Sequence, residues 1–227
     1  MLLGLPDNIT ACLFDLDGVI TQTATVHAKA WKQAFDEAQV PFNLPDDYDD
    51  YVDGKAREDG VRSLLDAKAI PATDELVTKI AERKDDIFLA LIHSHGVQTY
   101  ETSVRYLHAV REAGKKLAVV SSSRHTTEVL HAAGLQHTFD AQVDGLVAEE
   151  EMLKGKPAPD TYLKAAEMLN TSPANAAVYE DSLAGVGAGR AGSFGLVVGI
   201  DRAGQATALK QDGADIVVKD LGELLPA

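Results

Sequence analysis

Two pairs of acidic residues stand where strands are predicted to end. Asp15 and Asp17 follow the first apolar run of the chain, and Glu180 and Asp181 follow a later one. The carboxyl ends of parallel strands meet at one edge of a sheet, where open sheets bind ligands. Like charges about 4 Å apart cost about 4 kcal/mol per pair at an effective dielectric of 20, so this cluster needs a cation. An all-oxygen ligand set predicts a hard divalent ion such as Mg²⁺.

The spacing of Asp15 and Asp17 would allow one to act as a nucleophile and the other as a general acid and base. One carboxylate can attack phosphorus while the other, two residues along, transfers the proton of the leaving oxygen. We therefore expect Asp15 to be the nucleophile and Asp17 the general acid and base. The structural alternative is that residues 15–18 form only a turn and that Asp181 caps the next helix. The occurrence of both pairs at predicted strand ends favours the catalytic interpretation.

Two further polar segments are predicted at the same edge of the sheet. Ser121 and Ser122 follow another apolar run, and Lys156 lies just before a predicted helix. Transfer of a phosphoryl group depends mainly on positioning and charge stabilisation. We expect the Ser121 hydroxyl, the Ser122 backbone N–H and the Lys156 ammonium to bind the transferring group. The serines could instead cap the helix that follows, and Lys156 could be a solvated side chain.

The elements that must hold these residues alternate between strand and helix. Short apolar runs predict strands, and apolar residues three and four apart predict helices. The predicted strands are 9–14, 116–120, 176–179, 194–200 and 215–218, and the predicted helices are 103–113, 126–133, 158–169, 182–191 and 205–210. This order predicts an α/β fold with a Rossmann-like, doubly wound parallel sheet covered on both faces.

The segment between residues 23 and 98 has a different pattern. Helical periodicity covers 24–38, 58–68 and 74–92, with no convincing strand. Both ends of the segment are polar, and the second contains Gly96, as expected of a hinge pair. We therefore predict an α-helical cap domain, residues 23–98, inserted into an α/β phosphotransferase core formed by residues 1–22 and 99–227.

The composition limits the classes of partner. The 227 residues are 45% hydrophobic and 25% charged, as in a globular protein, and a net charge of −14 argues against binding nucleic acid or an anionic membrane. No run approaches about 18 apolar residues, and the start of the chain lacks a basic signal-peptide region. We expect a cytoplasmic monomer with Cys12 packed in the core. The histidines other than His27 lack metal-ligand spacing and are expected at the surface or at helix ends.

The chain resembles the haloacid dehalogenase superfamily, and within it the beta-phosphoglucomutase branch. The resemblance covers nearly the whole length and rests on Asp15-Leu16-Asp17-Gly18-Val19, Ser121, Lys156-Pro157-Ala158-Pro159-Asp160 and Glu180-Asp181-Ser182, in the family's order. It implies an aspartyl phosphate on Asp15, with Mg²⁺ held by Asp15, the Asp17 main-chain carbonyl and Asp181, and with Glu180 assisting. It also implies that Ser121, Ser122 and Lys156 bind the phosphate.

The resemblance extends to the predicted cap. It implies that the substrate-binding residues there are His27, Trp31, Gly54, Arg57 and Lys84. Arg57 matches the group that grips the distal phosphate of a bisphosphate intermediate, and an Arg fork suits a phosphate that is held without reacting. Arg57 could instead pair with its acidic neighbours at the surface, and Trp31 could belong to the core of the cap.

These observations lead to three functional hypotheses. The favoured one is a Mg²⁺-dependent phosphotransferase acting on a small phosphorylated sugar, a beta-phosphoglucomutase that interconverts beta-glucose 1-phosphate and glucose 6-phosphate. The first alternative is a phosphatase of the same build, in which water accepts the phosphoryl group. The second is a non-catalytic phosphosugar-binding protein. Arg57, Lys84 and His27 together favour the mutase, and intact Asp15 and Asp17 argue against a protein without activity.

Overall fold

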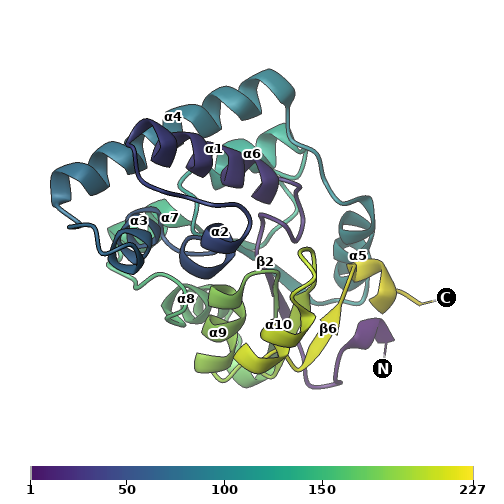
Figure 1. Cartoon of the computed structure of the whole chain (residues 1–227). Coiled ribbons are helices and arrows are strands. Elements are labelled where there is room, and N and C mark those ends of the chain that lie inside the picture. The colour runs from purple at the N-terminus through teal and green to yellow at the C-terminus, as the bar shows by residue number, and fades with distance from the viewer. Residues whose placement is uncertain (1, 227) are drawn as a thin grey trace.

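A single parallel sheet organises the protein (Figure 1). The computed structural model describes residues 2–226, so residues 1 and 227 of the predicted core lie outside it. Within residues 2–226 the sheet has six strands in the order β3-β2-β1-β4-β5-β6. Their bounds are β1 Ala11–Phe14, β2 Lys116–Val120, β3 Ala141–Val143, β4 Ala176–Glu180, β5 Leu196–Ile200 and β6 Ile216–Val218. Strand β1 pairs with both β2 and β4, so the strand order reverses at β1, where open sheets bind ligands.

Helices cover both faces of the sheet because its strands are apolar on both sides. In β1, Cys12 and Phe14 enter one hydrophobic core while Ala11 and Leu13 enter the other. Helices α5 (Glu101–Glu112) and α6 (Thr126–Ala132) pack on the first face, and α8 (Asp160–Met168), α9 (Leu183–Ala191) and α10 (Ala206–Asp212) pack on the second. The predicted α/β fold, with a doubly wound sheet, and the predicted burial of Cys12 are confirmed.

Four helices lie between β1 and α5 in the sequence, and we refer to them together as the cap. They are α1 (Ala24–Glu37), α2 (Asp46–Tyr51), α3 (Arg57–Ala67) and α4 (Asp74–His95). In Figure 1 they gather on one side of the sheet, with α1 against α4. Trp31 and Phe35 lie on the buried face of α1, as the spacing of the apolar residues predicts.

The two segments that join the cap to the sheet run side by side. Thr21 forms an isolated bridge with Thr99, and the Gln22 N–H donates to the Gln98 carbonyl at 2.8 Å. Gly96 follows the last residue of α4 with φ of 73°, a left-handed conformation that favours glycine. The predicted helical insertion is therefore present, and its boundaries at 22/23 and 98/99 stay predictions.

Two short elements of the core depart from the sequence-based expectation. Strand β3 was not predicted, because the polar Gln142 separates its two apolar residues and leaves no apolar run. The helix after it, α7 (Gly145–Glu150), was also missed, although the Asp144 carboxylate caps it by accepting from the N–H groups of Leu146 and Val147. In the cap, the acidic helix α2 was not predicted, because its residues show no apolar spacing typical of a helix. The remaining short turns of 3₁₀ helix are Leu2–Gly4, Pro173–Asn175 and Leu221–Leu224.

Candidate active site

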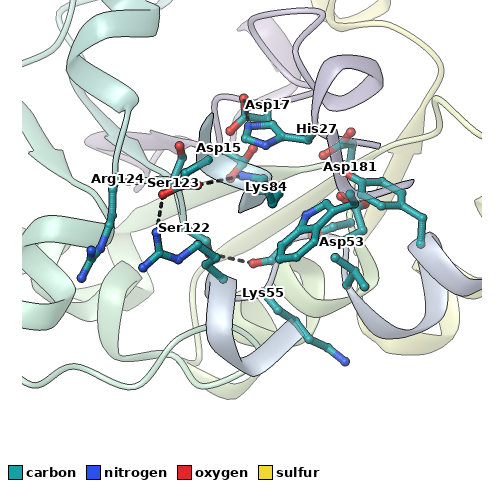
Figure 2. Close-up of a pocket in the computed structure, with 17 residues that line it drawn as sticks. Asp15, Asp17, His27, Asp53, Lys55, Lys84, Ser122, Ser123, Arg124 and Asp181 are labelled. Carbon is teal, nitrogen blue, oxygen red and sulfur yellow. Dashed lines mark hydrogen bonds and ion pairs between the residues drawn. The ribbon is translucent and has the colours of Figure 1, made fainter. Parts of the chain in front are cut away.

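Three strands deliver acidic and hydroxyl side chains to the carboxyl edge of the sheet. Asp15 follows β1, Glu180 is the last residue of β4, and Ser121 follows β2. One carboxylate oxygen from each of Asp15, Glu180 and Asp181 lies within 4.8 Å of the others, and all three residues are buried. The convergence predicted from the strand ends is therefore confirmed for these three. Figure 2 shows Asp15 and Asp181 facing the pocket beneath the cap.

A buried lysine ties the cluster together. Lys156 Nζ lies 2.5 Å from Asp15 Oδ1 and 2.6 Å from Glu180 Oε1, and it donates to the Val120 carbonyl at 3.1 Å. Only 2% of the lysine surface is exposed. Burial alone would lower the pKa of Lys156, but the charges of Asp15 and Glu180 outweigh it and hold that pKa above its ordinary value. The lysine is a permanent cation beside the predicted nucleophile, not a solvated side chain.

The carboxylates still carry more negative charge than Lys156 offsets. Burial raises the pKa of Asp15, with Lys156 opposing the rise and Glu180 adding to it. Burial likewise raises the pKa of Asp181, and the charges of neighbouring carboxylates reinforce the effect. Gly18, with φ of 85°, lets the loop after β1 press against this cluster, because a Cβ there would lie 1.7 Å from Asp181 Oδ2. Close-set oxygen donors with uncompensated charge fit a divalent cation.

The carboxylate of Asp17 is directed elsewhere. Its Oδ1 accepts a hydrogen bond from Thr23 and lies 3.2 Å from His27 Nε2, while Ser121 Oγ donates to its Oδ2 at 3.2 Å. Burial opposes ionisation, but His27 and the two hydroxyls outweigh it and hold the pKa of Asp17 below its usual range. The expectation that four carboxylates surround one ion is therefore wrong for this side chain. Binding through the Asp17 main-chain carbonyl stays a prediction.

The cap contributes an aromatic and cationic lining. Lys84 of α4 is 5% exposed, and its Nζ lies 5.3 Å from the ring centroid of Trp31 and 5.0 Å from that of Phe88. The His27 ring stacks on Phe88 at 4.0 Å, and Trp31 stacks on Phe35 at 5.3 Å. Trp31 therefore belongs to the cap core and also lines the pocket. Burial lowers the pKa of Lys84 and of His27.

Two acidic residues of the pocket, Asp53 and Asp85, were not predicted from the sequence. Burial raises the pKa of Asp53 to about 7, with Glu180 among the charges that add to the rise. Asp85 forms an ion pair with Arg57, the residue for which only sequence neighbours were considered as partners. Both acids lie in segments rich in other charged residues, so no signal in the sequence singled them out.

One histidine makes a contact that was not predicted from the sequence. His125 lies at the start of α6, as predicted for a helix end, but its Nε2 lies 3.4 Å from Asp85 Oδ2 of the cap. Figure 2 shows Ser122, Ser123 and Arg124, which precede it, lining the same side of the pocket. This loop of the core therefore faces the cap.

The cap is closed over the site in this structure. Ser122 Oγ donates to the Gly54 carbonyl at 2.7 Å, which joins the core to the cap. Gly54 has φ of 71°, and a Cβ there would lie 2.2 Å from Ser182 Oγ. The pocket beneath the cap measures about 70 Å³, whereas small-molecule pockets usually span about 300–1,000 Å³. A ligand of ordinary size therefore fits this pocket only when the cap moves.

Comparison with known proteins places this site in a family. Residues 9–192 match the family model of haloacid dehalogenase-like hydrolases. The chain belongs to this family. Its relatives include the beta-phosphoglucomutase of Mycobacterium tuberculosis, which is 50% identical over 246 residues, covering 98% of this chain and 94% of the relative. The beta-phosphoglucomutase of Bacillus subtilis is 34% identical, covering 94% and 91%.

A solved structure agrees with these relationships. The crystal structure of beta-phosphoglucomutase from Clostridium difficile aligns with a TM-score of 0.80 and 26% identity over 95% of this chain and 93% of that one. The prediction of a haloacid dehalogenase enzyme of the beta-phosphoglucomutase-like branch is confirmed. Among residues 2–226, no helix combines the length and apolarity needed to cross a bilayer.

Proposed function

We propose that this protein is a Mg²⁺-dependent beta-phosphoglucomutase that interconverts beta-glucose 1-phosphate and glucose 6-phosphate. One observation carries the proposal: the same pocket is lined by Asp15 of the core, which Lys156 contacts at 2.5 Å, and by the cationic side chains Arg57 and Lys84 of the cap. A sugar with a phosphate at each end needs cationic groups at both ends of its site. A site that only removes a phosphate needs cationic groups around the reacting phosphate alone.

The transfer begins at Asp15. A carboxylate oxygen attacks phosphorus, the bond from phosphorus to the sugar oxygen breaks, and an aspartyl phosphate forms. Lys156, the Ser121 hydroxyl and the Ser122 N–H bind the phosphoryl oxygens. Asp15, the Asp17 carbonyl and Asp181, with Glu180 assisting, would hold Mg²⁺, which neutralises phosphoryl charge when bound.

We propose that Asp17 transfers the proton to and from the sugar oxygen. Its low pKa keeps it ionised in the free enzyme, the form that accepts a proton from a sugar hydroxyl as that hydroxyl attacks the aspartyl phosphate. In the opposite half of the reaction the protonated carboxyl returns the proton to the leaving sugar oxygen. Thr23 and His27 orient this carboxylate, and we propose that His27, Trp31, Gly54 and Lys84 of the cap contact the sugar phosphate.

Closure of the cap decides which acceptor is used. A closed cap excludes water, which would otherwise hydrolyse the aspartyl phosphate and make the enzyme a phosphatase. The hydrogen bond from Ser122 to the Gly54 carbonyl supports such closure. We also propose that the protein works as a cytoplasmic monomer, since one chain supplies every residue of the proposed site.

A phosphorus NMR time course tests the reaction. The purified protein is mixed with beta-glucose 1-phosphate, Mg²⁺ and a trace of glucose 1,6-bisphosphate, and we expect glucose 6-phosphate to accumulate. Release of inorganic phosphate without glucose 6-phosphate would instead establish the phosphatase. The Asp15→Asn variant and removal of Mg²⁺ with EDTA should each abolish turnover. Absence of Mg²⁺-dependent turnover on any phosphate ester, with normal phosphosugar binding by D15N, would leave the non-catalytic binding protein.

A further inference from the structure

One carboxylate of the cap, Asp85, is shared by two cationic side chains and a histidine. It pairs with Arg57 of α3, its Oδ1 lies 3.5 Å from Lys84 Nζ on its own helix, and its Oδ2 lies 3.4 Å from His125 Nε2 of the core. Helices α3 and α4 of the cap and the N-cap residue of α6 therefore meet at the Asp85 carboxylate. The sequence alone predicted that Arg57 and Lys84 bind the substrate. It did not predict that the Asp85 carboxylate lies beside both of them.

Two of the side chains around Asp85 have nitrogen atoms without a hydrogen-bond partner. Arg57 Nε is buried and has no hydrogen-bond partner among the described residues, and His125 Nε2 lies near Asp85 without forming a hydrogen bond of good geometry. A guanidinium group offers five N–H donors and can hold an oxyanion with two of them at once. The Asp85 carboxylate therefore occupies these groups only in part.

Asp85 is negatively charged at this place. Burial opposes its ionisation, but the His125 contact and the charges of Lys84 and Arg57 outweigh burial and hold the pKa of Asp85 below its usual range. Arg57 also pairs with Glu58, whose Oε1 lies 3.6 Å from Arg57 Nη2 and which is half exposed. A second anion brought to Arg57 therefore meets a partly buried like charge at Asp85, and the two compete for the same donors.

We propose that Asp85 is a specificity-determining residue, an internal anion that holds Arg57 and His125 until the second phosphate of a sugar bisphosphate displaces it. The inference rests on the proposed function, because it concerns the second phosphate of that reaction. A monophosphate bound at Asp15 leaves the Asp85 pairs intact, whereas a bisphosphate has to break them. A mutase must release its bisphosphate intermediate from Arg57 and bind it again turned around, and a resident competitor makes that release faster.

The test measures binding to the full chain in the D15N background, which leaves the ligands unreacted. Isothermal titration with Mg²⁺ present gives the affinities for glucose 1,6-bisphosphate and for glucose 6-phosphate. We expect Asp85→Asn to tighten bisphosphate binding about tenfold, because a competing like charge is gone, and to change monophosphate binding less than about twofold. The matched control is Asp86→Asn, an exposed neighbour on α4 with the same change of charge, which should alter neither affinity.

Other results would overturn the inference. Weaker bisphosphate binding by D85N would mean that Asp85 only positions Arg57, and equal tightening of both ligands would mean a general effect of charge. Unchanged affinities would also refute competition. D85S serves the same comparison if D85N does not fold. Failure of the parent chain to bind glucose 1,6-bisphosphate would overturn the proposed function together with this inference, whereas binding without an effect of D85N refutes the inference alone.

Discussion

The buried lysine offers a quantitative test of how the site is held together. Lys156→Met removes the charge and keeps an unbranched side chain that is one atom shorter. Lys156 Nζ lies 2.5 Å from Asp15 Oδ1 and 2.6 Å from Glu180 Oε1. At an effective dielectric of 20, the Coulomb attraction in each pair is about 6 to 7 kcal/mol before desolvation is counted. Desolvation of the ammonium group cancels most of this gain, so the net loss on breaking the network is about 3 to 5 kcal/mol.

Urea unfolding at pH 8 without Mg²⁺ measures that loss as a difference in the free energy of unfolding. Lys164→Met is the matched control, because Lys164 lies on nearby α8 and pairs with Glu151 and Glu167 at the surface. Surface ion pairs contribute about 0 to 1 kcal/mol, so K164M should stay close to wild type. Saturating Mg²⁺ should recover part of the K156M loss, because it neutralises the same carboxylates. If K156M loses no more than K164M, the buried network does not stabilise the core and the reasoning is wrong.

Two further substitutions test the closed cap and its internal ion pair. Gly54→Ala places a Cβ against Ser182 and should raise KM for the sugar phosphate about tenfold or more. The control Gly204→Ala has the same left-handed φ but open space around it, so it should leave KM unchanged. Equal KM values for the two variants would refute a closure contact at the Gly54 loop. Asp47→Asn should lower the free energy of unfolding at pH 7 by about 1 kcal/mol, because the Lys68 hydrogen bond at 2.7 Å holds the pKa of Asp47 below its unfolded value. That stabilisation is present above about pH 4 and is lost as the pH falls through the lower native pKa, so the two unfolding curves should converge in acid; a constant difference would contradict the assignment.

The edge of the sheet was predictable because its signals are local. Asp15 and Glu180 each stand at the end of an apolar run, and the parallel order of strands then brings the runs together. The cap was predictable as an insertion because helical periodicity continued where a second strand was expected. Strand β3 was not, since Gln142 interrupts its three residues, and only the pairing with β2 identifies them as a strand.

The direction of individual side chains was beyond the sequence. Asp17 follows Asp15 by two residues, and spacing alone placed both at one ion. The structure turns the Asp17 carboxylate toward Thr23 and His27 because the loop after Gly18 leads directly into the cap. The pairing of Asp85 with Arg57 and His125 joins residues 28 and 40 positions apart, and such a contact leaves no periodic trace.

The central position of the first strand affects how the protein folds during synthesis. Strand β1 emerges first from the ribosome, but its partners on either side begin at residues 116 and 176. The helices between β1 and β2 are contiguous in sequence and can pack early, whereas pairing over such long separations is slow. The strand that precedes Asp15, the proposed nucleophile, therefore lacks at least one partner through most of translation, and the proposed site is complete only when the fourth strand docks beside the first.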